Sequence, residues 1–206
     1  MSRDVPEKGA AGKSRRPSAR ERIRETAREL FYKRGIRGVG VELIAAEAGT
    51  TKMSLYRNFA SKDELVAECL CAQEEDFRAW WQRTVLPYEG NPRRQIEALF
   101  EALREQTMHA DWPRGCQFAN AAVELPDDDH PARAVILAHH RELREKLRDL
   151  CRGMEARQPE ALADALLLLM AGGYMSCLVF DSTDVVSSVE VAARILLSSE
   201  LGAPSE

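Results

Sequence analysis

The stretch from Thr50 to Leu65 reads TTKMSLYRNFASKDEL and combines hydroxyl, cationic and aromatic side chains within one short helical register. On a helix, Leu55 and Phe59 lie one turn apart on the same face, so both should pack inward. The outward face then carries Lys52, Met53, Tyr56 and Arg57, a set of side chains that could contact DNA. The alternative is an ordinary amphipathic helix whose polar face is simply solvated.

The outward side chains have two kinds of partner on DNA. At the N-terminus of a recognition helix, Lys52 can donate to guanine O6 and N7, and Met53 can contact a thymine methyl group. Contacts to phosphates position a protein without reading sequence. The side chains placed to donate to phosphates are Tyr56, Arg57, Asn58 and Lys62. At Lys62 the first turn of the next helix adds free N–H groups, which also favour an anion.

A first helix must support this stretch from its N-terminal side. Ser18 and Glu21 have the S-x-x-E spacing of a capping box, and apolar residues then recur at helical spacing. Gly35 follows the last of them and is a natural residue to end a helix. The sequence therefore predicts a helix over about residues 18–34.

Short helices surround the candidate reading stretch. A second helix is expected around residues 41–48, and Thr50 or Thr51 can cap a third. Ser61 and Glu64 form another capping-box pair, after which a long helix should follow. Two short helices joined by a tight turn that contains glycine are typical of a helix-turn-helix.

The rest of the chain is predicted to be helical as well, because apolar residues keep the 3.6-residue period and strand signals are sparse. The fold class is therefore all-α, with an N-terminal three-helix helix-turn-helix followed by a larger helical region. The further helices are expected over residues 92–108, 116–125, 132–154, 161–180 and 184–201.

Charge is distributed unevenly along the 206 residues, although the net charge is only −4. Residues 1–60 carry 14 Lys and Arg against 7 Asp and Glu, whereas the remainder carries 15 against 26. A basic N-terminal third on an acidic body predicts a polyanionic partner for that third alone. Residues 1–17 have almost nothing to bury and are expected to form a disordered basic tail. The alternative is such a tail beside an ordinary domain.

Three features bear on the compartment. The five cysteines are scattered and odd in number, which favours reduced thiols in the cytoplasm over a disulfide framework. No secretory leader pattern is visible at the start, so secretion is not expected. The longest apolar run, 165–180, is short for a membrane span and contains two glycines. We therefore expect a cytoplasmic protein with no membrane partner.

Residues 18–65 resemble the DNA-binding domain of the TetR family of bacterial transcriptional regulators, and residues 44–65 carry its motif. The family pattern is roughly I-A-x-x-A-G-V-S-x-G-x-L-Y-x-H-F-x-x-K-x-x-L, and this chain reads IAAEAGTTKMSLYRNFASKDEL without a gap. The resemblance implies a helix-turn-helix domain over residues 18–65. It implies phosphate contacts by Thr51, Tyr56, Asn58 and Lys62, and base contacts by Lys52, Met53 and Ser54.

The sequence departs from the family pattern at three places. Val39 and Gly40 replace the usual threonine pair, so the second helix should lack a hydroxyl cap. Met53 stands where the family usually has glycine, and Asn58 replaces a histidine. These departures affect individual contacts and the operator sequence rather than the domain itself.

The resemblance also implies that residues 66–206 bind a small-molecule effector and form a homodimer through the last two helices. The expected function is a ligand-responsive regulator, a repressor, that binds a palindromic double-stranded DNA operator and releases it when an effector of unknown identity binds. The residues agree, since a helix over 161–180 is too apolar for the surface of a monomer. The alternative is that this helix is central in its own domain.

An effector pocket should be apolar and aromatic with a few polar groups. Cys116, Asn120 and Glu124 follow one another at helical spacing and form a row with polar groups. The full set of candidate pocket residues is Phe77, Trp81, Leu103, Cys116, Asn120, Glu124 and Tyr174. The alternative is that the aromatic members belong to the hydrophobic core.

Other chemistry is sparse. Cys69 and Cys71 would point in directions about 200° apart on one helix, so a shared metal is not expected. A thiol- or metal-responsive regulator that uses Cys116 is the alternative to an organic effector. Neither a P-loop nor an HExxH motif or nucleophile elbow is found, so we expect no enzyme and no cofactor.

Overall fold

The computed structural model describes residues 17–108, 114–180 and 183–200, and this part of the chain contains helices and no strand. The all-α prediction is confirmed. The expected tail at residues 1–17 lies outside the described residues except for its last position, Pro17.

Three short helices form the N-terminal unit, and we call them the reading end: α1 (Ala19–Arg34), α2 (Val41–Glu47) and α3 (Lys52–Asn58). The capping box predicted at the start of α1 is present, because the Ser18 side chain accepts from the Glu21 N–H and the Glu21 carboxylate accepts from the Ser18 N–H. α1 ends at Gly35, whose φ of +79° favours glycine.

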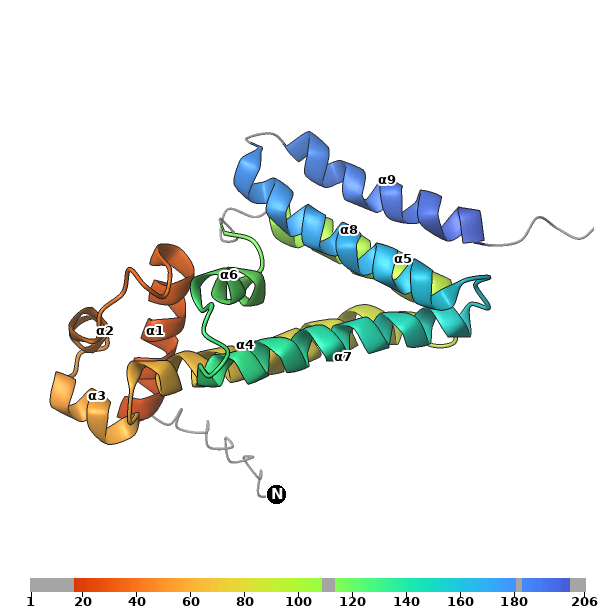
Figure 1. Cartoon of the computed structure of the whole chain (residues 1–206). Helices are drawn as coiled ribbons and strands as arrows, with labels where there is room; N and C mark the ends of the chain where they lie inside the picture. The colour runs from red at the N-terminus through yellow and green to blue at the C-terminus, as the bar shows by residue number, and fades with distance from the viewer. Residues whose placement is uncertain (1–16, 109–113, 181–182, 201–206) are drawn as a thin grey trace, which may run out of the picture.

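The remaining helices are α4 (Lys62–Val85), η1 (Leu86–Tyr88), α5 (Pro92–Met108), α6 (Gln117–Glu124), α7 (Pro131–Gly153), α8 (Pro159–Val179) and α9 (Thr183–Glu200). The five helices predicted beyond residue 91 match their expected ranges to within one or two residues at each end, and a short 3₁₀ helix that was not predicted, η1, follows α4. In Figure 1, α4 and α7 run side by side from the reading end, α5 and α8 form the next layer, and α9 lies on the outside. The second capping pair differs in detail, since Glu64 accepts from the Ala60 N–H rather than from Ser61.

Two hydrophobic cores fill the molecule. The first joins α1, α2 and α3 to the start of α4, to α6 and to the start of α7, and it includes Leu70, Phe118 and Ile136. The second lies among α4, α5, α7, α8 and α9. The division proposed between residues 65 and 66 therefore falls inside one continuous helix and one continuous core. The proposed functional division thus does not coincide with a boundary between independently packed bodies.

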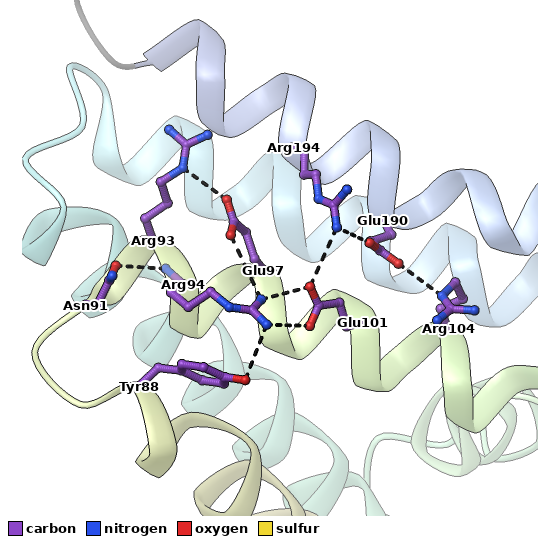
Figure 2. A network of polar contacts seen from close by, with 9 residues as sticks. All are labelled: Tyr88, Asn91, Arg93, Arg94, Glu97, Glu101, Arg104, Glu190 and Arg194. Atoms are coloured by element: carbon purple, nitrogen blue, oxygen red, sulfur yellow. Dashed lines mark hydrogen bonds and ion pairs between the residues drawn. The ribbon is translucent and has the colours of Figure 1, made fainter.

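A network of ion pairs ties α5 to α9 at the far end of the molecule (Figure 2). The Arg94 guanidinium donates two hydrogen bonds of 2.8 Å to the Glu101 carboxylate. Arg194 of α9 pairs with Glu101 and Glu190, and Arg104 of α5 pairs with Glu190 at 3.0 Å. The network links α9 to α5 through partly exposed side chains.

The helix α8 is apolar on both its buried and its exposed sides. Leu166 and Met170 are buried, whereas the side of α8 turned away from the core leaves Leu168 73% exposed and Met175 57% exposed. On α9, Val191 and Ile195 are exposed as well. By length and composition α8 could cross a membrane, which is weak evidence because core helices of soluble proteins pass the same test.

Candidate nucleic-acid interface and effector cavity

The helix α3 is oriented as its sequence predicts. Leu55 and Phe59 are buried in the first core, at 0% and 1% exposure, so one face of α3 is fixed against α1. Met53 is 67% exposed and Tyr56 is 43% exposed on the other side, and Arg57 is exposed too. The inward and outward faces of the predicted reading helix are thus confirmed, while its contacts with DNA stay a prediction.

Cations from α1 hold the carboxyl ends of the two short helices. The Arg20 guanidinium donates to the Asn58 carbonyl at the end of α3, and it lies 4.3 Å from the centroid of the Phe59 ring. Arg22 Nε donates to the Ala48 carbonyl at the end of α2, at 3.5 Å. Carbonyls at a helix C-terminus have no partner within the helix and carry partial negative charge, so both contacts stabilise the helix ends.

Several side chains that are predicted to contact phosphates already form hydrogen bonds within the protein. Thr51 caps α3 by accepting from the Ser54 N–H at 3.1 Å, and Asn58 Nδ2 donates to the Ser54 carbonyl at 2.7 Å. Lys62 Nζ donates to the Ile36 carbonyl at 2.6 Å, in the segment between α1 and α2. Lys62 therefore fixes the turn that precedes α2, a role that the sequence did not indicate.

The start of α2 shows the consequence of the missing threonines. Gly40 occupies the N-cap position and makes no side-chain hydrogen bond, and Val39 is fully buried in the first core. The prediction that this helix lacks a hydroxyl cap is confirmed. An unexpected contact lies close by, because Glu42 in the first turn of α2 forms an ion pair with Lys52 at the start of α3. Sequence spacing alone could not find it, since it depends on how two helices pack.

A cavity of about 650 Å³ lies between α4, α6, α7 and α8. Its apolar lining includes Phe77, Trp80, Phe118, Leu143, Leu167, Met170, Met175 and Leu178. Polar groups on its wall include Gln73, Gln106, Gln117, Asn120, His139 and His140. The size and lining are those of a site for a small organic molecule.

The structure brings four of the seven candidate pocket residues together. The cavity is lined by Phe77, Cys116, Asn120 and Tyr174. Trp81 and Leu103 instead belong to the second core, where they are 6% and 0% exposed, because aromatic and aliphatic residues at helical spacing also serve to pack helices. These two do not line the cavity.

Glu124 lies away from the cavity as well. Its carboxylate accepts from the Arg37 N–H at 2.9 Å and lies against Gly35, where an added Cβ would stand 3.0 Å from the carboxylate oxygens. The row formed by Cys116, Asn120 and Glu124 thus continues past the cavity to the turn between α1 and α2. The sequence correctly predicted that the three residues form a row, but not that Glu124 lies outside the cavity.

His139, on the cavity wall, forms a buried pair with Glu74 behind it. His139 Nδ1 lies 2.5 Å from Glu74 Oε2, and the imidazole stacks on Phe118 with centroids 3.7 Å apart. Burial lowers the pKa of His139, against the opposing effect of Glu74, so the neutral imidazole is favoured. No group of three or more His, Cys, Asp or Glu able to hold a metal occurs in the described residues.

The segment before α6 connects the cavity to α1 and α8. Asn120 Nδ2 donates to the Arg114 carbonyl at 2.6 Å, and the Arg114 N–H donates to the Tyr32 hydroxyl of α1 at 3.1 Å. Gly115 has a φ of +62°, and a Cβ there would stand 2.7 Å from the Tyr174 carbonyl of α8. α6 is therefore held against the reading end at both of its ends.

Comparison with known proteins places this geometry in a family. A model described as bacterial regulatory proteins, tetR family, matches residues 23–69, and one described as transcriptional regulator LmrA/YxaF-like, C-terminal domain, matches residues 92–191. A candidate TetR transcriptional regulator from Streptomyces avermitilis is 30% identical over 89% of this chain and 98% of its own, with a TM-score of 0.79. The chain belongs to the TetR family.

Other TetR relatives agree over different parts of the chain. A TetR-family transcriptional regulator from Streptomyces coelicolor has a TM-score of 0.84 and 27% identity, covering 89% of this chain and 90% of its own. The HTH-type transcriptional repressor KstR2 of Mycobacterium tuberculosis is 36% identical over 95 residues, which are 45% of this chain. The match spans 46% of the length of that repressor. The protein is thus a TetR-family transcriptional regulator, and such regulators bind DNA and are generally not enzymes.

The cysteines of this TetR-family chain are free thiols. Cys69 is buried and Cys71 is exposed, as their spacing on one helix predicts. Burial raises the pKa of Cys116, which disfavours the thiolate that a redox sensor needs.

Proposed function

We propose that this protein is a cytoplasmic repressor that binds a palindromic operator as a homodimer and releases it when a small organic molecule occupies the cavity. One observation carries the proposal. The helix α6 lines the cavity through Asn120 and holds the turn before α2 through Glu124. A ligand that displaces α6 would therefore act on the support of the reading end.

The proposed dimer forms through the exposed apolar side of α8 and α9. Contiguous exposed apolar surface on a soluble protein indicates an interaction site. The exposed large apolar residues there that do not line the cavity are Val179, Phe180, Val191 and Ile195. Leu168, Met175 and Leu178 are exposed as well, but they also line the cavity. A two-fold dimer would present two copies of α3 to half-sites about 34–36 Å apart, as a palindrome requires.

Release would follow from unequal affinities of the effector for two arrangements of α6. In the arrangement described here, Glu124 accepts from the Arg37 N–H and lies against Gly35. A ligand that binds more tightly when α6 is shifted would favour the arrangement in which this contact is lost. The change in operator affinity can be no larger than that difference in ligand affinity.

The first experiment is a gel shift with the DNA upstream of the protein's own gene. The double variant Lys52→Ala and Tyr56→Ala should lose specific binding, because it removes one proposed base contact and one proposed phosphate contact. A matched control changes the same residue types elsewhere, at Lys33 and Tyr88. If the α3 double variant binds that DNA as well as the wild-type protein does, operator recognition by α3 is wrong.

A further inference from the structure

The two short helices of the helix-turn-helix are joined by an ion pair at their N-terminal ends. Lys52 Nζ, at the first residue of α3, lies 2.5 Å from Glu42 Oε1 in the first turn of α2. Both side chains face solvent, with 52% and 67% of their surfaces exposed. Glu42 therefore lies beside the residue that we expect to reach base edges first.

Stability does not explain this pair. Exposed ion pairs contribute little to folding. The helix α3 is already capped by Thr51, anchored by Leu55 and Phe59, and held at its far end by Arg20. The pair is therefore expected to add little to the position of α3.

The carboxylate is also unfavourable for general DNA binding. A negative charge near the phosphates is repelled by them, and here it also offsets the charge of the lysine. A protein that needed only phosphate attraction would do better with a neutral residue at position 42. The repulsion between Glu42 and the phosphates is offset if Glu42 accepts a hydrogen bond from a base.

One base pair matches a donor held beside an acceptor. In the major groove, guanine offers N7 and O6 as acceptors, and the neighbouring cytosine offers the N4 amino group as donor. Guanine O6 and cytosine N4 are hydrogen-bonded neighbours within the pair, just as the Lys52 ammonium and the Glu42 carboxylate are neighbours on the protein. An A·T pair places its donor between two acceptors, which leaves the lysine one acceptor rather than two.

We infer that Glu42 is a specificity-determining residue that reads a G·C base pair together with Lys52. Lys52 donates to guanine O6 and N7, and Glu42 accepts from cytosine N4. The inference rests on the proposed binding of an operator through α3. It adds α2 to the sequence-reading surface and names the base pair that the two residues select in each half-site.

The test is selection from random double-stranded DNA with wild-type protein, Glu42→Ala, Lys52→Ala and Glu47→Ala. Glu47 is an exposed glutamate on the same helix, so Glu47→Ala controls for the loss of one negative charge. Wild-type protein should select a G·C pair at one position of each half-site. Glu42→Ala should reduce discrimination at that position by about 5- to 150-fold, as the loss of one good base contact does. Lys52→Ala should relax the same position, and Glu47→Ala should relax none.

Three outcomes would overturn the inference. Glu42→Ala could keep every wild-type preference, the position that it relaxes could favour A·T, or Lys52→Ala could relax a different position. Failure of the proposed function is distinguishable, because wild-type protein would then select no sequence at all. Glu42→Ala should also bind random DNA more tightly than the wild type does, since the repulsion from phosphates is gone. Circular dichroism verifies that each exposed-site variant is folded.

Discussion

At the reading end, several cations donate to backbone carbonyls, whereas between α5 and α9 the cations pair with carboxylates of the neighbouring helix. Arg20 and Lys62 donate to the carbonyls of Asn58 and Ile36, and Glu124 accepts from a backbone N–H at the same end. The contacts between α5 and α9 join side chains instead, as Figure 2 shows for Arg194 with Glu101 and Glu190.

Helix length explains this contrast. α2 and α3 have seven residues each, so most of their backbone groups lie within an end turn and need partners outside the helix. α5 and α9 have 17 and 18 residues and satisfy most of their backbone groups internally. Changes at the reading end should therefore displace the recognition helix, while changes in the far network should leave the helices in place.

The largest expected effect compares two fully buried leucines. Leu55 of α3 and Leu166 of α8 are both 0% exposed, and replacing either with alanine should cost about 2–5 kcal/mol of unfolding free energy. Among the molecules that remain folded, we expect Leu55→Ala to lose specific operator binding and Leu166→Ala to keep it. Urea denaturation and DNA titration on the same samples measure both quantities. Equal losses of operator binding in the two variants would contradict the proposed separation of roles.

The next effect concerns the contact between α6 and the reading end. Glu124→Ala leaves the Arg37 N–H without its acceptor, which should cost about 0.5–1.5 kcal/mol because the hydrogen bond is exposed and water can replace the carboxylate. The variant should still bind an effector, since Glu124 does not line the cavity, but the effector should weaken operator binding less than in the wild type. Glu89→Ala, at an exposed glutamate far from α6, serves as the control. An unchanged effector response in Glu124→Ala would exclude this coupling route.

A smaller effect depends on pH. Hydrogen bonds from Arg78 and Lys146 lower the pKa of Glu142 to about 2, from a usual value of 4.5. The lowered pKa stabilises the folded protein above pH 4.5, and this contribution disappears as the pH falls toward 2. Glu142→Gln should therefore be less stable than the wild type at pH 7, and the difference should shrink below pH 4.5. If the urea midpoints of Glu142→Gln and the wild type differ by a constant amount from pH 7 to pH 3, the lowered pKa of Glu142 does not contribute to stability.

The smallest effect is expected in the far network. Glu101→Gln removes a partner of both Arg94 and Arg194, yet the groups are partly exposed and the loss should stay within about 1 kcal/mol. Burial of Val189, Ala193 and Leu197 should keep α9 in place. Thermal unfolding at low and high salt checks this, because the effect of the substitution should decrease with salt. A loss as large as that of a core leucine would show that the network holds α9.

The sequence predicted the helices well because their signals are local. Capping pairs such as Ser18 with Glu21, a glycine at a helix end and a 3.6-residue apolar period all act within a few residues. The same reasoning predicted that Leu55 and Phe59 face inward and that α8 is apolar on more than one side. These features depend only on neighbours along the chain.

Tertiary contacts account for what the sequence did not predict. Glu124 lies in the predicted row with Asn120, but its partner, Arg37, is 87 residues away. The Glu42 and Lys52 pair depends on the crossing of α2 and α3, and the Glu74 and His139 pair on the packing of α4 against α7. No local pattern identifies such partners.

The central claim is that one small molecule in the cavity lowers operator affinity through α6. The most direct measurement is the dissociation constant of labelled operator DNA, by fluorescence anisotropy, with and without a compound selected for raising the melting temperature of the protein. Our account predicts weaker operator binding with the compound, and the operator should weaken compound binding by the same factor. It would be contradicted by a compound that occupies the cavity, as shown by loss of binding in Phe77→Ala, yet leaves the operator affinity unchanged.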